Sequence, residues 1–171
     1  MKRGESEAFR ELVARHQRSA LTLAYRMLGK WDDAEDAVQD AFVRVFRSLH
    51  TFSESGLFWP WFRRIVINCC LKRTSREVPA DHVDVLLDSI QPLVDSTESE
   101  ILKHCEFEDV RTAISGLPPG YRNVVVLRYQ ENLSASQIAE ALDLSMVAVR
   151  VRLHRALRML AERLAVIGIE L

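Results

Sequence analysis

The stretch that most constrains this chain is residues 134–160, SASQIAEALDLSMVAVRVRLHRALRML. Ser134, followed three residues later by Gln137, has the pattern of a capping box, which begins a helix. Helical spacing breaks at residues 143–145, where Ser145 can cap a second helix. An apolar stripe follows at Met146, Val149, Leu153, Ala156, Leu157 and Leu160. A short helix, a tight turn and a longer helix are typical of a helix-turn-helix.

The remaining faces of the second helix are rich in arginine. Guanidinium groups bind guanine edges bidentately or hold phosphates, and small apolar side chains can cover thymine methyls. We therefore predict a contact with duplex DNA, with Arg155 and Arg158 on phosphates and Arg150 on bases. The alternative is an amphipathic hairpin with a solvated basic face. The candidate contact residues are Ser145, Val147, Ala148, Arg150, Val151, Arg152, His154, Arg155 and Arg158.

Composition favours a globular, helical protein. The 171 residues are 48% hydrophobic and 27% charged, with 6 glycines and 5 prolines. No run alternates in the way a half-buried strand does, so we predict an all-α fold. The apolar runs are too short for a membrane span, and no signal-peptide pattern opens the sequence. We therefore expect a cytoplasmic protein that does not insert into membranes.

The sequence offers no pattern typical of a catalytic or metal site. Cys69, Cys70 and Cys105 match no zinc-binding spacing, so we expect reduced structural thiols, with a metal or redox site as the alternative. There is no phosphate-binding loop and no nucleophile elbow. We expect no metal, no cofactor and no enzyme activity.

Charge is unevenly distributed along the chain. Basic blocks lie in residues 61–76 and 110–171, and the acidic stretch between them contains a single base, Lys103. This pattern indicates two nucleic-acid contacts joined by a connector that avoids DNA. We predict one helical domain over residues 1–77, a flexible linker over 78–98 and a second helical domain over 99–171.

The first domain should begin with a helix that ends at Gly29, followed by a helix from Asp32 or Asp33 to about His50. Ala34, Ala37, Val38, Ala41, Phe42, Val45 and Leu49 are expected to face inward. Acids at one end of the outer faces and arginines at the other fit a protein-binding face, although an ordinary solvated face has the same pattern. The candidate binding residues are Asp36, Gln39, Asp40, Arg44 and Arg47.

Residues 58–62, FWPWF, carry four aromatic side chains directly before two arginines. One helical stripe cannot bury all four, so we expect some to be exposed, with Phe58 and Trp59 favoured. Exposed aromatics can stack on unpaired bases while arginines hold the strand; the alternative is a core cluster. The candidate single-strand contacts are Phe58, Trp59, Trp61, Arg63, Arg64, Asn68, Lys72, Arg73 and Arg76.

Together, these stretches resemble the sigma-70 family, specifically its extracytoplasmic-function group. DAEDAVQDAFVRVFRSL resembles the helix that binds the clamp of RNA polymerase, and FWPWFRRIVINCCLKRTSR resembles the segment that melts and reads the −10 element. Residues 117–160 resemble the region that reads the −35 element. The sequence departs from the family pattern at Lys72, often an aspartate, at Ala148 and Val151, often Thr or Ser, and at Trp59-Pro60.

The resemblance implies a promoter-specificity subunit that binds core RNA polymerase and promoter DNA, and an anti-sigma factor that regulates it. The alternative is a helix-turn-helix regulator that binds duplex DNA without polymerase. A regulator of that kind needs neither the acid-led helix nor the aromatic-basic block. A protein-interaction adaptor would leave both basic blocks unexplained.

Overall fold

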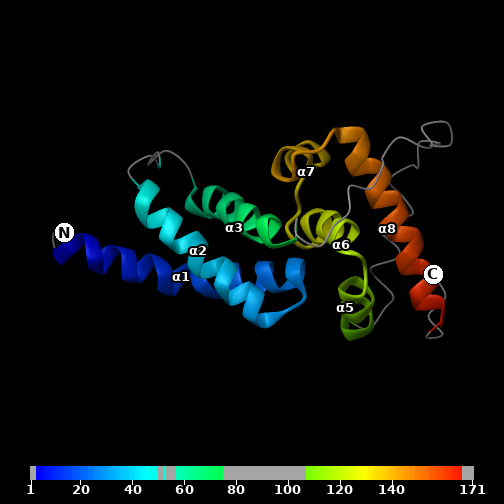
Figure 1. The fold of residues 1–171 in the computed structure, drawn as a ribbon, viewed down its shortest axis with the longest axis horizontal. Helices are drawn as coiled ribbons and strands as arrows, with labels where there is room; N and C mark the ends of the chain where they lie inside the picture. Colours follow the sequence, from blue (N-terminus) through cyan, green and yellow to red (C-terminus); the bar gives the residue numbers. More distant parts are fainter. Residues whose placement is uncertain (1–2, 50–51, 53–56, 75–106, 167–171) are drawn as a thin grey trace. The chain divides into compact units, whose positions relative to one another are not determined.

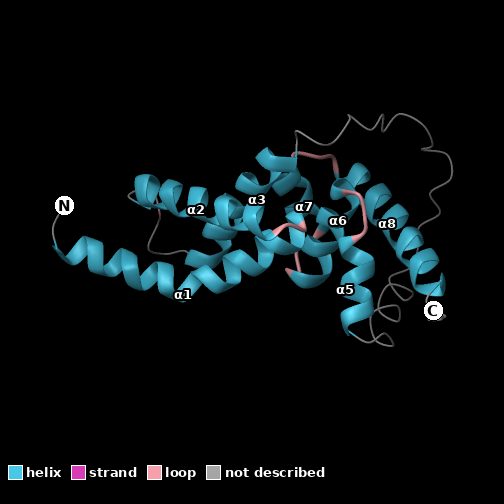
Figure 2. Cartoon of the chain, turned by 60° about the horizontal axis from the view of Figure 1, so that its bottom comes forward, coloured by secondary structure: helices cyan, strands magenta, loops and turns pink. Residues whose placement is uncertain are grey.

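The computed structural model describes residues 3–49, 52, 57–74 and 107–166, and every regular element in these ranges is a helix (Figure 1). Figure 2, coloured by secondary structure, shows the same helices from a second direction. The chain divides into two compact units, residues 1–77 and 78–171. The predicted all-α class is confirmed for the described part of the chain. The expected linker, residues 78–98, lies outside the described residues, as do Arg76 and Cys105.

The N-terminal unit contains α1 (Arg3–Leu28), α2 (Trp31–Ser48) and α3 (Phe58–Thr74). Each of these helices packs against the other two, because each carries apolar residues at helical spacing on one side. The largest fully buried side chains of this unit are Leu23, Met27, Val45, Phe62, Val66 and Ile67. Burying each one stabilises the fold by about 1.5–3 kcal/mol.

The turn between α1 and α2 depends on a glycine. Gly29 has a φ of 76°, which a residue with a Cβ adopts only with strain. Its N–H donates a 2.7 Å hydrogen bond to the carbonyl of Tyr25, which closes the last turn of α1. The predicted end of the first helix is therefore confirmed.

The expected cap of α2 is wrong. α2 begins at Trp31, its N-cap residue is Lys30, and no side chain caps it. Asp32 and Asp33 lie inside the first turn, where their charges favour the positive helix N-terminus without a capping hydrogen bond. The expected inward face is confirmed from Ala34 to Val45, but Leu49 is 38% exposed because α2 ends at Ser48.

The C-terminal unit contains α5 (Phe107–Ser115), α6 (Pro119–Val125), the π-helical turn η3 (Val126–Gln130), α7 (Ala135–Leu142) and α8 (Met146–Val166). Pro119 begins α6, at a position where its missing N–H costs nothing. α8 packs against α5, α6 and α7. The buried side chains of this unit include Leu117, Val124, Leu127, Ile138, Val149, Leu153, Ala156, Leu160 and Leu164.

The apolar stripe of α8 is confirmed over most of its length, and Met146 is the exception. Its side chain is 48% exposed. Met146 is the first residue of α8, whereas Val149 and Leu153, one and two turns further along, are buried. Leu157 is half-buried. The spacing of the stripe therefore predicts the inner side of the helix, but not where the core ends.

Candidate nucleic-acid interfaces

The helix-turn-helix of the C-terminal unit has both predicted caps. The hydroxyl of Ser134 accepts the Gln137 N–H at 3.2 Å, and the Gln137 side-chain oxygen accepts the Ser134 N–H at 2.9 Å. Asp143, with a φ of 53°, ends α7 in the left-handed conformation. The hydroxyl of Ser145 then accepts the Ala148 N–H at 3.0 Å and caps α8. These local bonds orient α8 relative to α7.

The outer face of α8 brings most of the predicted duplex contacts together. Exposed side chains on it are Ser145, Val147, Arg150, His154, Arg155 and Arg158, whereas Val151 and Arg152 are half-buried. Arg152 reaches back over α6, where a Cβ placed on Gly120 would lie 3.6 Å from its Nη1. Arg158 lies 4.0 Å from Glu162, a surface pair with little effect on stability. A row of arginines on one helix face is suited to phosphates and guanine edges.

Ala148 does not share this face. Its side chain is only 6% exposed. Because the position lies next to Val149 on the inner side of α8, its methyl group packs into the unit. Ala148 is therefore left out of the proposed contact surface.

The aromatic residues of α3 form a cluster that is larger than the sequence indicates. Phe62 is fully buried, 4.7 Å between ring centroids from Phe42 of α2. Phe58, Trp59 and Trp61 are half-buried, so the expected exposure of Phe58 and Trp59 is only partial. Other segments of the unit supply aromatic packing partners that the spacing within α3 does not reveal. His16 of α1 stacks on Trp59 at 6.1 Å, and Phe52 lies 5.2 Å from Trp61 and 5.7 Å from Phe58.

His16 is a part of this cluster that sequence reasoning missed. Its ring lies 4.8 Å from that of Phe58, and burial together with the charge of Arg15 lowers the pKa of His16. The imidazole packs as an aromatic partner against Phe58, Trp59 and Phe62. A histidine seven residues after Phe9 on the same helix is the only signal in the sequence that could have indicated it.

One side of α3 carries a polar and basic row. Trp61, Arg64, Asn68 and Lys72 follow one another at three- and four-residue spacing, so they share one side of the helix. Arg64, Asn68 and Lys72 are exposed, and Trp61 is half-buried at the start of the row. Arg63 is half-buried too, but its spacing places it on the same side as Trp59, away from this row. The row itself combines an aromatic surface with positive charge, which suits a single strand.

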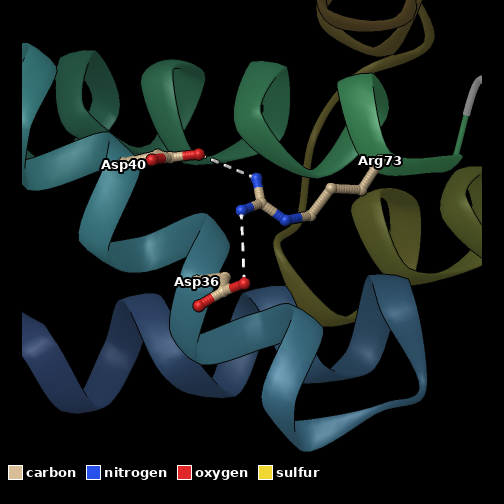
Figure 3. Close-up of polar contacts among 3 residues, drawn as sticks. All are labelled: Asp36, Asp40 and Arg73. Carbon is tan, nitrogen blue, oxygen red and sulfur yellow. Dashed lines mark hydrogen bonds and ion pairs between the residues drawn. The ribbon is translucent and has the colours of Figure 1, made fainter.

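Arg73 belongs to a different side. It follows the buried residues Cys69 and Cys70 by one helical turn, and its guanidinium faces α2. Nη1 donates a 2.9 Å hydrogen bond to Asp40, and Nη2 lies 3.8 Å from Asp36 (Figure 3). Burial opposes the charge, but the hydrogen bond and attraction to the two carboxylates raise the pKa of Arg73. The structure thus joins a predicted DNA contact to two predicted protein contacts.

The remaining candidate protein-binding residues lie where α2 was expected to present them. Asp36, Gln39, Asp40 and Arg47 are exposed, and Arg44 is half-buried. Beside them, an apolar groove of about 460 Å³ lies between α1 and α2, which sequence reasoning missed. The signal for it in the sequence was two apolar residues on the outer faces of α2, Val43 and Phe46. Their side chains are 45% and 46% exposed. The groove is lined by Phe9, Val13, Gln17, Leu21, Glu35, Val38, Gln39, Phe42, Val43 and Phe46.

The two described cysteines are free thiols in the core of the N-terminal unit. Burial raises the pKa of Cys69, and it raises the pKa of Cys70 to about 12. Within the described residues, no group of three or more His, Cys, Asp or Glu side chains is placed to hold a metal ion. None of the described helices is long and apolar enough to cross a membrane.

Two parts of the chain match family models. Residues 12–78 match Sigma-70 region 2, and residues 107–160 match Sigma-70, region 4. The chain is 28% identical to the ECF RNA polymerase sigma factor SigW of Bacillus subtilis, over 96% of this chain and 92% of the relative. It is 32% identical to the RNA polymerase sigma-E factor of Streptomyces coelicolor, over 94% of this chain and 88% of the relative.

Solved structures with a similar fold include CnrH in complex with the cytosolic domain of CnrY. That similarity covers 94% of this chain and 90% of CnrH, with 30% identity and a TM-score of 0.58. The sigma factor RpoE of Bartonella quintana, solved with the anti-sigma factor NepR, is similar over 94% of this chain and 98% of its own. Its TM-score is 0.61 at 21% identity, which supports the fold alone.

Proposed function

The chain belongs to the extracytoplasmic-function group of the sigma-70 family, and we propose which of its surfaces carry out promoter-specific transcription initiation. We propose that residues 1–77 bind core RNA polymerase and the −10 element, that residues 78–98 are a linker, and that residues 99–171 bind the −35 element. Because transcription takes place on the chromosome, we infer that the protein acts in the bacterial cytoplasm.

The −35 contact is assigned to the outer face of α8. Residues near the N-terminus of the second helix of a helix-turn-helix reach base edges, while those further along contact the backbone. Val147 and Arg150 lie in the first turns and are assigned to bases; Arg155 and Arg158 are assigned to phosphates. Ser145, Val151, Arg152 and His154 complete the proposed surface.

The −10 contact is assigned to α3. Trp61, Arg64, Asn68 and Lys72 share one side of this helix, so an unpaired strand running along it can meet an aromatic surface and positive charge together. Phe58 lies beside Trp61, with 5.6 Å between their ring centroids, and is included. Trp59 and Arg63 lie on another side of α3 and are included from the sequence pattern alone. Arg76 lies outside the described residues and is included from the sequence alone.

The polymerase contact is assigned to α2, through Asp36, Gln39, Asp40, Arg44 and Arg47. These side chains present acids towards the start of the helix and arginines towards its end, so they can complement a surface of mixed charge. An anti-sigma factor is proposed as a second partner, as membership of this family implies. In this mechanism the protein positions polymerase on the promoter and performs no catalytic step.

The observation that carries the proposal is the pairing of two unlike surfaces in one chain, the arginine row of α8 and the aromatic-basic row of α3. A regulator of duplex DNA needs only the first. The test is run-off transcription from a promoter library, with bacterial core polymerase in the presence and absence of the chain. Specific transcripts are expected only when the chain is present. Sequence-specific binding to duplex DNA without any specific transcript would instead identify a regulator.

A further inference from the structure

The ion-pair cluster Asp36–Asp40–Arg73 joins the two functional helices of the N-terminal unit (Figure 3). Asp36 and Asp40 are four residues apart, so their carboxylates lie on one face of α2 and repel each other. The guanidinium of Arg73 lies between them, 2.9 Å from Asp40 and 3.8 Å from Asp36. One side chain of α3 therefore contacts both acids of the proposed polymerase face and offsets one of their two negative charges.

Arg73 is more buried than Arg64 and Lys72 of the polar and basic row. The Arg73 side chain is 27% exposed, whereas those of Asp36 and Asp40 are 69% and 56% exposed. The carboxylates can thus be reached from solvent while the guanidinium is held behind them. A strand on the side of α3 that carries Arg64 and Lys72 would meet Arg73 only at the edge of its path.

We propose that Arg73 is a positioning residue for polymerase binding: it holds the carboxylates of Asp36 and Asp40 against α3 and presents them in one orientation. This inference rests on the proposed role of α2. Orienting the acids in advance lowers the ordering cost at the interface. It also reassigns Arg73, which the sequence pattern places among the contacts to the −10 strand.

The test is a double-mutant cycle on the affinity of the full chain for core polymerase, using Arg73→Gln, Asp40→Asn and the double variant. Each single change is expected to weaken binding about two- to fivefold, as for an exposed charged pair. The double variant should bind more tightly than the product of the two single losses predicts, because part of the effect of Arg73 passes through that carboxylate and the rest through Asp36. Losses that multiply would overturn the proposal.

Arg15→Gln is the matched control. Arg15 also pairs with a carboxylate at 2.8 Å, that of Glu11, but on α1 and away from the proposed face. The Arg15→Gln variant should bind core polymerase with the same affinity as the unmodified chain. Arg73→Lys keeps the charge but not the fork of donors, so it should restore part of the affinity lost in Arg73→Gln. Thermal unfolding of every variant by circular dichroism separates lost binding from lost folding.

A second measurement distinguishes two possible roles of Arg73, positioning the acids of α2 and contacting the −10 strand. In the holoenzyme, Arg73→Gln should leave the salt dependence of binding to single-stranded −10 oligonucleotides unchanged, whereas Arg64→Gln should reduce the slope. A reduced slope with unchanged core affinity would make Arg73 a strand contact. If Asp40→Asn leaves core affinity unchanged, both the α2 assignment and this inference fail. Specific transcription would then show whether the sigma-factor role itself stands.

Discussion

At the residue scale, the arginines of α8 differ in the kind of DNA contact they are proposed to make. Arg155→Ala should weaken promoter binding about equally on all sequences and lower the salt slope by about one, because a phosphate contact carries no sequence information. Arg150→Ala should relax specificity and cost about 1–3 kcal/mol at the base it reads. Binding of holoenzyme to a −35 library at several salt concentrations measures both. A changed base preference in Arg155→Ala would contradict the assignment.

Cys69 and Cys70 allow a second prediction at this scale. Burial raises the pKa of Cys70 to about 12, so at pH 8 its thiolate fraction is about a thousandfold below that of a thiol at the ordinary value of 9.0. In a Cys105→Ser variant, neither thiol should react with Ellman's reagent at pH 8 until the protein unfolds. The pKa of Cys70 is higher in the folded protein than in the unfolded chain. Burial of its neutral thiol therefore contributes fully to stability below about pH 9, and this contribution is lost as the pH rises towards 12. Rapid labelling of the native protein would show that α3 opens locally.

At the scale of the element, α3 combines a buried side and the side that we propose binds the −10 strand. Arg64→Ala removes an exposed positive charge from the polar row. Polymerase carrying it should protect the −35 element but leave −10 thymines unreactive to permanganate, since strand capture has to offset unstacking of the bases. Trp61→Ala should have the same effect, with a loss of about 1–3 kcal/mol per stacked base.

Trp59 provides the comparison within the same helix. Its indole stacks on His16, so Trp59→Ala should mainly reduce the free energy of unfolding and should affect melting less than Trp61→Ala. Chemical denaturation and permanganate footprinting of the two variants distinguish these effects. Full melting of an ordinary duplex by both Arg64→Ala and Trp61→Ala would rule out the strand path along this side of α3.

At the scale of the whole molecule, the two proposed DNA-binding units imply that affinity depends on their spacing. With the linker proposed for residues 78–98, the second unit has a low effective concentration once the first has bound, and polymerase can raise it by holding both in place. The isolated chain is therefore expected to bind promoter duplex weakly and with little sequence preference. Fluorescence anisotropy with and without core polymerase measures the difference. Tight, specific binding by the isolated chain would favour the duplex regulator.

Local features were readable from the sequence because they depend on residues close together in the chain. The capping box at Ser134, the cap at Ser145, the glycine turn at Gly29 and the inner faces of α2 and α8 all follow from short-range geometry. So does the helix-turn-helix, which needs only two caps and a left-handed residue between them. These features, taken in order, also carried the family resemblance.

Contacts between helices were decided only by the tertiary structure. The stacking of His16 on Trp59 and the pairing of Arg73 with Asp40 join residues more than 30 positions apart, and helical spacing says nothing about which helices meet. Helical spacing puts Arg73 on the side of Cys69 and Cys70 but does not show that it meets Asp40, and a position counted as inner can lie beyond the core, as at Met146. Periodicity determines the side of a helix, whereas packing determines what that side touches.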